Sequence, residues 1–322
     1  MTDMSTPAVI KNSNIDSNQT TIEDGAKLTD VEIKGREIII KSGATLTDCK
    51  IFSEGTVHVG CKTVIKEGTI INAFKSVSIG NGVIIDRDVF IGGMQSEKSA
   101  IEVGNDCVIL YRSYLNTTRK ISIGNNVGIG GYCLIFTHSA WQNVLNGNPY
   151  KFADVEIKDN AWLPWNVTVL PGVIIERDVT IGTGSTVTKS VPPYVFAAGV
   201  PAKVIRKKDL CTLSQEDKNM IVLEIMRDFQ DYASKFLKLK DIETVQGRDF
   251  GITYNDYRLL YTLHFNHIQR NDIVMSFKIP DEIKKQNEWI ELDLQRSNTL
   301  QDIANYFISF VRRYGIKIVV EK

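Results

Sequence analysis

One histidine of this chain lies at a position where its side chain could act as a catalytic base. His138 belongs to "FTHSAWQNVLNGNPYKFADVE", the largest insertion in an otherwise regular sequence pattern. An imidazole accepts a proton near neutral pH more readily than other side chains. A hydroxyl is a poor nucleophile unless a base takes its proton in the transition state. The residue type and its place therefore favour general-base catalysis over the surface role that is usual for a lone loop histidine.

The elements that must position His138 follow a six-residue period. The residues that share this register are aliphatic or aromatic: Ile22, Leu28; Ile40, Leu46, Phe52; Val59, Ile65, Ile71; Ile79, Ile85, Ile91; Val103, Ile109, Leu115; Ile123, Ile129, Ile135; Ile157, Leu163, Val169; Ile175, Ile181, Val187. Residues six apart on β-strands face the same side, so three short strands per turn make a triangular coil around an apolar interior. The pattern predicts a mainly β protein built on a left-handed parallel β-helix of about seven coils.

Each predicted turn consists of three six-residue units, or hexads. All residues beyond these three units follow the third hexad of a turn. Every insertion, including the one that holds His138, is therefore expected at one corner of the prism. Repeat proteins commonly place such insertions on their binding face. A β-sandwich would instead show alternation with frequent hairpin signals, of which Asn81-Gly82 and Asn146-Gly147 are present. The hexad register explains far more positions than a sandwich does.

The chain divides into four predicted segments. Residues 1–19 form an N-terminal segment, 20–192 the β-helix, 193–208 its C-terminal extension, and 209–322 a small α/β domain. In that last domain, Ser214 is expected to cap a helix whose apolar stripe runs from Val222 to Phe236. "DIVMSFKI", "WIELDLQ" and "IKIVV" alternate like strands. A second helical stripe, from Leu300 to Tyr314, is expected to end at Gly315.

Composition excludes several classes of function. The 322 residues contain 38 Lys and Arg against 38 Asp and Glu, so nothing suggests a nucleic-acid or membrane-surface partner.

The five cysteines are scattered, as expected of reduced, buried thiols. No apolar run approaches the ~20 residues of a membrane span, and the N-terminus lacks the apolar region of a signal peptide. His264 and His267 lack a third ligand, so we expect no metal site and a cytoplasmic protein.

The repeat and two motifs resemble the hexapeptide-repeat acyltransferases. The resemblance covers about residues 20 to 208 and fits best the galactoside, maltose and virginiamycin O-acetyltransferase branch. "THSAW" is similar to that family's loop-entry motif and its catalytic histidine. "NAWLPWNVTVLPGVIIERDVTIGTGSTVTKSVPPYVFAAGVPAKVIR" resembles the segment that closes the β-helix and holds coenzyme A. The resemblance implies that His138 deprotonates an acceptor hydroxyl, which then attacks acetyl-CoA.

The same resemblance assigns a cofactor site position by position. It places Thr183 where the family lines the pantetheine path, usually with Ala. Thr188 and Lys189 match positions that contact the cofactor. Lys203 and Arg206 match basic positions near its phosphates, as suits a ligand with several negative charges. The resemblance also implies a homotrimer, because these enzymes work as trimers with sites between neighbouring prisms.

Two departures from the family pattern concern the acceptor. Trp165 stands where the family has a small residue beside the thioester. Its ring could reshape the acyl tunnel or stack on an acceptor sugar, or the site could hold an acyl group other than acetyl. Leu110 stands where the galactoside branch has an asparagine that assists the acceptor hydroxyl. Arg112 and Asn116 are candidates to replace that asparagine, and Trp141 in the loop is a further candidate for acceptor contact.

The function that these features predict is acetyl transfer to a hydroxyl of a sugar or glycan precursor, as in polysaccharide biosynthesis. An N-acetyltransferase for an amino-sugar nucleotide is one alternative, although no G-x-G-x-x-G precedes the repeat. A zinc carbonic anhydrase on this fold would need three histidine ligands, and the repeat has only His58 and His138. A non-catalytic β-helix scaffold is the remaining alternative.

Overall fold

The computed structural model describes residues 6–208, 213–237, 239, 243–246, 249–292, 295–297, 300–311, 314, 316 and 318–320. The chain forms two compact units, residues 1–210 and 211–322. Each unit has its own hydrophobic core.

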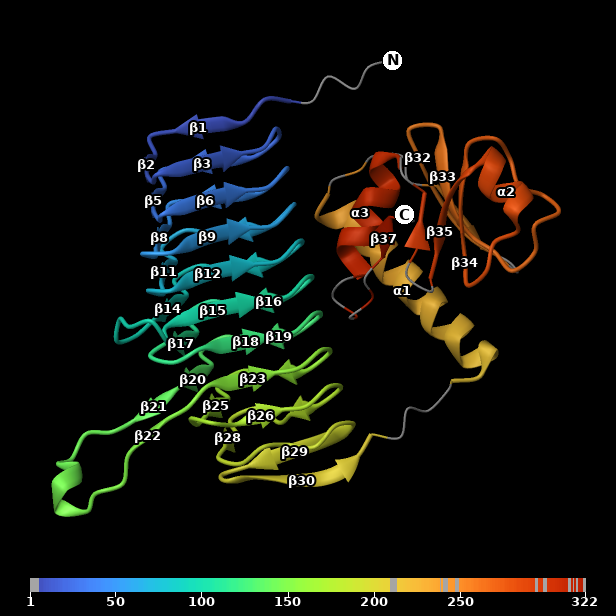
Figure 1. The fold of residues 1–322 in the computed structure, drawn as a ribbon. Helices are drawn as coiled ribbons and strands as arrows, with labels where there is room; N and C mark the ends of the chain where they lie inside the picture. Colours follow the sequence, from blue (N-terminus) through green and yellow to red (C-terminus); the bar gives the residue numbers. More distant parts are fainter. Residues whose placement is uncertain are drawn as a thin grey trace. The chain divides into compact units, whose positions relative to one another are not determined.

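The first unit is a triangular prism of three parallel sheets, whose coils stack one on the next (Figure 1). Sheet A contains eleven strands: β1 (Val9–Lys11), β4 (Lys27–Thr29), β7 (Thr45–Thr47), β10 (Val64–Ile65), β13 (Ile84–Ile85), β16 (Val108–Ile109), β19 (Gly128–Ile129), β24 (Trp162–Leu163), β27 (Thr180–Ile181), β29 (Val195–Gly199) and β30 (Ala202–Lys207). Sheet B contains nine: β2 (Asn14–Asp16), β5 (Glu32–Lys34), β8 (Lys50–Phe52), β11 (Ile70–Asn72), β14 (Phe90–Gly92), β17 (Tyr114–Asn116), β20 (Leu134–Phe136), β25 (Thr168–Val169) and β28 (Thr186–Val187). Sheet C contains eight: β3 (Gln19–Ile22), β6 (Glu37–Ile40), β9 (Thr56–Val59), β12 (Ser76–Ile79), β15 (Ala100–Val103), β18 (Ile121–Ile123), β23 (Val155–Ile157) and β26 (Ile174–Ile175). The predicted parallel β-helix is confirmed.

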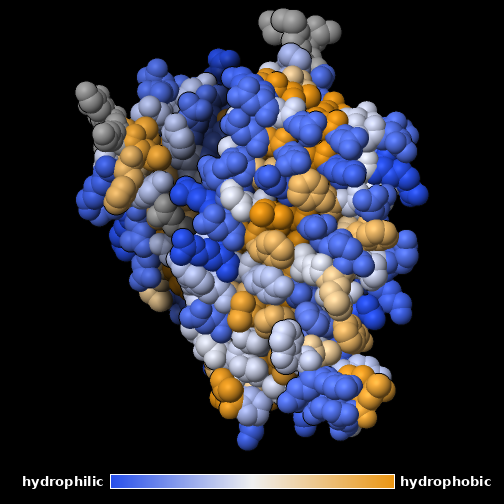
Figure 2. All heavy atoms as spheres, turned by 90° about the vertical axis from the view of Figure 1, so that its left-hand side faces the viewer, coloured by the Kyte–Doolittle hydropathy of each residue, from blue (hydrophilic) through white to orange (hydrophobic). Residues whose placement is uncertain are grey.

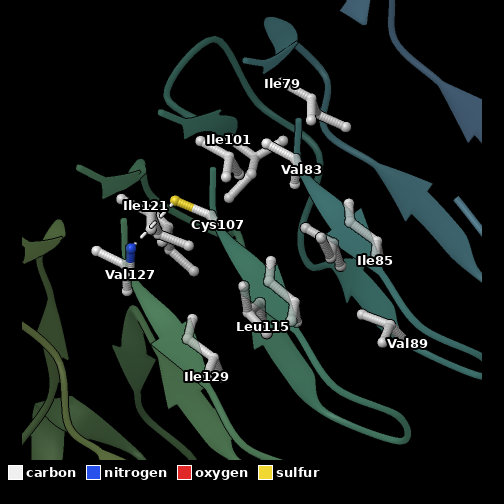
Figure 3. Packing of buried hydrophobic residues seen from close by; sticks show 14 of the residues in the cluster. Ile79, Val83, Ile85, Val89, Ile101, Cys107, Leu115, Ile121, Val127 and Ile129 are labelled. Atoms are coloured by element: carbon white, nitrogen blue, oxygen red, sulfur yellow. Dashed lines mark hydrogen bonds between the residues drawn. The ribbon is translucent and has the colours of Figure 1, made fainter. Parts of the chain in front are cut away.

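The hexad aliphatics form the interior columns of the prism. Ile65, Ile85 and Ile109 pair in register along sheet A, and none of them is exposed. Figure 3 shows such side chains from successive coils pointing into one shared interior. Because each strand is only a few residues long, one coil could not bury these side chains without its neighbours. Stacking is therefore what stabilises each coil.

The corners depend on two kinds of small or polar residue. Asp88 and Asn126 adopt left-handed backbone angles, with φ of 56° and 55°, which Asp and Asn tolerate better than most residues. The glycines that follow the inward aliphatic residues, such as Gly80 after Ile79, do not adopt such angles. A Cβ added to Gly80 would lie 2.6 Å from the carbonyl oxygen of Gly104 in the next coil, so these glycines are needed for space.

One predicted register is wrong in the early coils. In β8 the inward residue is Ile51, which is fully buried, whereas Phe52 is half-buried on the outer face. The corner between sheets A and B is one residue shorter here than in later coils, with Asp48 in the left-handed conformation two residues after Leu46. Since successive strand residues face opposite sides, one missing corner residue exchanges the inward and outward positions.

The prism also begins earlier than residue 20. Strands β1 and β2, in the segment set aside as 1–19, already pair with β4 and β5. At the other end, β29 pairs with β27 in parallel and β30 returns antiparallel to β29. The segment 193–208 thus closes sheet A with a hairpin.

The insertions leave the prism at the corner between sheets B and C, as their positions indicated. The largest begins with β21 (His138–Ser139), which pairs antiparallel with β22 (Lys151–Phe152). Its outer part contains the 3-10 turn η1 (Val144–Asn146). In Figure 1 this segment, residues 138–152, extends away from the stack as an arm. Trp141 and Leu145 on the arm are 99% and 90% exposed, so the chain's own core does not hold them.

The cysteines of the prism behave as packing residues. Cys49, Cys107 and Cys133 are buried at inward positions, and Cys61 is half-buried. Burial raises the pKa of Cys49 to about 12 and that of Cys133 to about 11, so both thiols stay protonated and unreactive at neutral pH. Cys211 lies outside the described residues.

The second unit combines helices with a seven-stranded mixed sheet among its described residues. Its elements are α1 (Gln215–Lys235), β31 (Glu243–Gln246), β32 (Phe250–Tyr254), β33 (Tyr257–Tyr261), β34 (Asp272–Ser276), α2 (Asp281–Gln286), β35 (Glu288–Glu291), β36 (Gln295–Arg296), α3 (Asp302–Val311) and β37 (Val319–Val320). Helices α1 and α3 share a core with the sheet, in which Phe229 meets Phe307 edge-on. No helix of the described residues combines the length and apolarity that a membrane crossing needs.

The predicted elements of this unit are largely present. Ser214 caps α1 by accepting the backbone N–H of Asp217, as expected. Phe236, expected on the buried stripe, is 71% exposed at the helix end, and Ala233 is buried instead. The sequence pattern did not indicate α2 or the strands β31 to β33. Gly315, the expected helix end, lies outside the described residues.

Candidate active site

His138 lies at the first position of the arm, directly after strand β20 and its one-residue connection. Its side chain is half-buried. Across the two-stranded ladder its partner is Phe152, and the two rings stack at 5.8 Å with an interplanar angle of 26°. The imidazole is thus held at the root of the arm rather than carried on its exposed tip.

A hydrogen bond to Asn116 fixes the tautomer of this imidazole. The Oδ1 atom of Asn116 lies 3.0 Å from Nδ1 of His138 and accepts the backbone N–H of Thr118 at 3.2 Å. A backbone N–H can only donate, so the atom that both groups share is the amide oxygen. His138 must therefore donate from Nδ1 in its neutral form. Nε2 is left without a proton and with a lone pair, as a general base requires.

A network of buried polar side chains lies next to His138. Asn116, Thr118 and Thr137 are each no more than 3% exposed. Thr137 donates its hydroxyl proton to the carbonyl oxygen of Asn116 at 2.6 Å. The amide nitrogen of Asn116 donates to the hydroxyl of Tyr114 at 2.9 Å. Because its polar groups are satisfied, this network can hold the imidazole in one orientation.

This placement revises the expected role of Asn116. The sequence suggested that Asn116 contacts the acceptor in place of the family's asparagine, but both ends of its amide make hydrogen bonds inside the protein. Asn116 is better placed to orient His138. Leu110 follows β16 at the corner between sheets A and B, a corner that His138 does not occupy.

We expect Asn116→Ala to lower kcat by about 10–100-fold, the range typical of a group that orients a functional histidine. Loss of the acceptor for Nδ1–H frees the ring to rotate and to adopt the other tautomer. Steady-state kinetics with thiol release as readout measures the effect. Asn72→Ala is the control, since Asn72 occupies the equivalent position in β11. Wild-type kcat in Asn116→Ala would show that the network does not orient His138 for catalysis.

An aromatic column lies on the outer face of sheet B beside His138. Phe90 stacks on Tyr114 at 5.5 Å and 9°, and Tyr114 lies 5.8 Å from Phe136. Phe90 and the neighbouring Leu134 are 38% and 37% exposed. Figure 2 shows hydrophobic residues gathered between hydrophilic ones on the side of the molecule where β11, β14 and β17 lie. The face next to His138 is therefore suited to the apolar side of a ring.

Trp165 occupies a different corner, between sheets A and B. Its ring packs edge-on against Tyr111 at 5.1 Å and lies 6.0 Å from the ring of Tyr132. It covers Gly131, where a Cβ would lie 2.4 Å from the ring. The ring is therefore turned along the corner toward preceding coils, and the bare Gly131 makes room for it.

Two other candidates for acceptor contact lie apart from His138 within the chain. Arg112 is exposed at the corner of Trp165, where its Nε lies 3.6 Å from a carboxylate oxygen of Asp88. It also donates to the hydroxyl of Tyr132 at 3.4 Å. Trp141 projects from the arm into solvent. His58 lies on the outer face of sheet C, in the ladder between Ile39 and Ser78.

The candidate cofactor residues surround the closed end of the prism. Thr188 and Lys189 follow β28 at the corner of His138, and Thr183 lies at the corner of Trp165. Lys203 and Arg206 lie on β30, with the Arg206 guanidinium 5.8 Å from the centre of the Phe196 ring. Among the described residues, no carboxylate lies within 4.0 Å of Lys189, Lys203 or Arg206. Such cations are free to meet phosphate groups.

The structure thus separates the expected site residues by corner. His138, Asn116, Thr188 and Lys189 share the corner between sheets B and C. Arg112, Trp165 and Thr183 share the corner between sheets A and B. A strand of sheet B separates the two groups in every coil, so one chain does not bring them together.

Sequence reasoning missed several residues around His138. Thr137, Thr118 and Tyr114 build the polar network, while Phe152 stacks on the imidazole. A signal was present, because the run Asn116-Thr117-Thr118 directly follows a hexad at the corner from which insertions leave. Polar residues at such a corner have to be satisfied by the next coil.

The predicted resemblance to hexapeptide-repeat acyltransferases, in their galactoside and maltose O-acetyltransferase branch, is confirmed by comparison with known proteins. The chain is 33% identical over 133 residues to the galactoside O-acetyltransferase of Escherichia coli, which covers 40% of this chain and 63% of that protein. A second relative, from Schizosaccharomyces pombe, is 42% identical over 89 residues, or 27% of this chain and 43% of that protein. The chain thus spans about two fifths to two thirds of the length of these relatives. No model of a known protein family matches the chain.

Solved structures that contain a similar repeat match this chain with low TM-scores. A hexapeptide-repeat acetyltransferase of Vibrio cholerae, solved in complex with acetyl coenzyme A, is 21% identical with a TM-score of 0.35, covering 40% of this chain and 72% of that one. A polysialic acid O-acetyltransferase is 19% identical with a TM-score of 0.40, covering 67% of this chain and 98% of that one.

Proposed function

We propose that this protein is an acetyl-CoA-dependent O-acetyltransferase that acts on a hydroxyl of a sugar or glycan precursor. The observation that carries the proposal is the fixed orientation of His138, whose Nδ1 is held by Asn116 so that Nε2 is available as a base. The similarity to the galactoside O-acetyltransferase supports the reaction type. We expect the protein to work in the cytoplasm, in polysaccharide biosynthesis.

In the proposed reaction, Nε2 of His138 takes the proton of the acceptor hydroxyl. The oxygen attacks the thioester carbonyl, and backbone N–H groups near the insertion corner stabilise the oxyanion that forms. The tetrahedral intermediate collapses with loss of coenzyme A as thiolate, which recovers a proton from the imidazolium. The hydrogen bond from Nδ1 to Asn116 supports both forms of the ring, because Nδ1 donates in each.

The coenzyme would be held by the unpaired cations at the closed end of the prism. Lys189, Lys203 and Arg206 suit its phosphates, with Thr188 beside them. Thr183 and the backbone of Trp165 suit the pantetheine and thioester portion. Thr183 stands near open space, since a Cβ on the adjoining Gly184 would meet nothing within 4 Å.

We further propose that the active protein is a homotrimer with each site between two prisms. His138 and Trp165 belong to different corners of one chain, so a complete site requires the corner of Trp165 from a neighbouring copy. The exposed apolar residues Trp141 and Leu145 of the arm suit burial against such a neighbour.

Incubation with acetyl-CoA and a panel of sugars, nucleotide sugars and amines tests the proposed function. Release of free thiol together with acetyl esters of the sugars is the expected result. Acetylation of amines alone would contradict the O-acetyl assignment. Absence of turnover with every acceptor, combined with absence of CoA binding, would favour the scaffold alternative.

The cofactor site predicts the effect of removing its cations. Lys189→Ala and Arg206→Ala should each raise the KM for acetyl-CoA more than they lower kcat, because they remove contacts with phosphates far from the reacting atoms. The difference from wild type should shrink at high salt. Lys158→Ala is the control, since Lys158 pairs with Glu156 at 2.8 Å elsewhere on the prism. Unchanged KM in both variants would move the cofactor site elsewhere.

A further inference from the structure

Arg119 lies beside the proposed base and has no carboxylate partner among the residues that the structure describes. It follows the Asn116-Thr117-Thr118 run, and its backbone N–H donates to the buried hydroxyl of Thr137 at 2.9 Å. Its guanidinium carbon lies 5.0 Å from the centre of the Phe152 ring. That same ring stacks on the imidazole of His138. One aromatic ring therefore sets the position of the guanidinium relative to the base.

The guanidinium of Arg119 has more N–H donors than its partners among the described residues use. It is half-buried, and Nη1 donates to the carbonyl oxygen of Thr118 at 3.2 Å. Nearby acidic groups serve other partners: Glu102 pairs with Lys120 at 2.6 Å, and Asp154 accepts the backbone N–H of Lys120. Within the described part of the chain, no carboxylate lies within 4.0 Å of Arg119. An arginine has five N–H donors, so an oriented fork remains for a ligand.

The coil order separates Arg119 from the cofactor cations. Along sheet B the strands follow in the order β17, β20, β25 and β28. His138 follows β20, Arg119 lies one coil before it, and Lys189 lies two coils after it. Coenzyme A bound at the closed end would therefore approach His138 from one side. Arg119 lies on the opposite side, where the acceptor must enter.

We propose that Arg119 binds an anionic group of the acceptor, so that the substrate is an acidic sugar. The guanidinium would take a carboxylate or a phosphate in a paired, charge-assisted hydrogen bond. The aromatic column of Phe90, Tyr114 and Phe136 lies on the neighbouring face, where it can meet the apolar side of the sugar ring. This inference rests on the proposed function and adds the chemical class of its acceptor.

Matched acceptors that differ only in charge test the proposal. The probes are methyl hexosides, the corresponding methyl hexuronosides and the corresponding hexoside 6-phosphates, each in the gluco and galacto series. With wild-type protein, kcat/KM should be roughly 10–100-fold higher for an acidic member than for its neutral match, as expected of hydrogen bonds to a charged group. The uronoside and phosphate arms show which anion the site takes.

The variant Arg119→Gln should bring the ratio of acidic to neutral kcat/KM close to one. Arg177→Gln is the control, because Arg177 also stacks on an aromatic ring, Tyr194 at 5.3 Å, but lies at the corner between sheets C and A. It should keep the preference for the acid. Equal use of neutral and acidic members by wild type, or a preference that survives Arg119→Gln, would overturn the inference while leaving acetyl transfer intact. No thiol release with any member would instead overturn the proposed sugar acetyltransferase, and the acidic subsite with it.

Discussion

Replacement of His138 by Asn is expected to abolish most acetyl transfer while the fold survives. Asn is similar in reach and polarity, so it can keep contact with Asn116 and with the arm. It cannot accept the proton of the acceptor hydroxyl. General-base catalysis supplies about 10²–10⁴-fold, so kcat should fall by that factor while the KM for acetyl-CoA changes little. Steady-state kinetics of both parameters measures the split.

The pH dependence of the rate adds a second readout. The pH profile of kcat should differ between the wild type and His138→Asn, because the variant lacks the proposed general base. His58→Asn is the control, because His58 lies on the outer face of sheet C in an earlier coil. If His138→Asn turned over its acceptor at near-wild-type rate with the same pH profile, another group would be the base.

Val169→Asp is expected to prevent folding of the prism. Val169 is fully buried and pairs in register with Ile135 on one side and Val187 on the other. A carboxylate there would lie unpaired in an apolar column, at a cost on the order of several kcal/mol. Soluble yield and thermal unfolding followed by circular dichroism measure the loss.

The adjacent residue supplies the control for this experiment. Thr168 belongs to the same short strand but lies half-buried on the outer face. Thr168→Asp should therefore fold with a melting temperature close to that of the wild type. A soluble Val169→Asp protein with unchanged melting temperature would show that this side chain does not point inward.

The fold of the prism could be read from its hexads because each aliphatic residue meets its counterpart in the next coil. The buried environment of Ile85 could be predicted because its neighbours in the adjacent coils, Ile65 and Ile109, occupy the same position of the hexad. The rule fails at Phe52, where Asp48 shortens a corner by one residue and Ile51 turns inward instead. The coil that contains this corner is one residue shorter than the next coil, since Ile40 pairs with Val59 and Val59 with Ile79, but the aliphatic period starts again at Val59 and does not show where the residue is missing.

The candidate site was less predictable because its contacts cross coils and follow side-chain direction. His138 could be singled out from its position at the insertion corner. Its partner Asn116 is 22 residues earlier, and only the stacking of neighbouring coils brings the two together. The ring of Trp165 could have faced Thr183 or Tyr132, and the absence of a side chain at Gly131 decides for Tyr132. Neither fact follows from spacing alone.

The reversal of β30 has a consequence for the behaviour of the protein in concentrated solution. A stack of parallel coils is a template that could in principle recruit a further strand from another molecule at its open rim, as amyloid fibrils do. Because β30 runs against β29, the rim it offers has the wrong direction to continue the parallel repeat. The strand is also charged, with Lys203, Arg206 and Lys207 exposed. At the edge of sheet A, β30 therefore opposes the growth of filaments by further parallel strands.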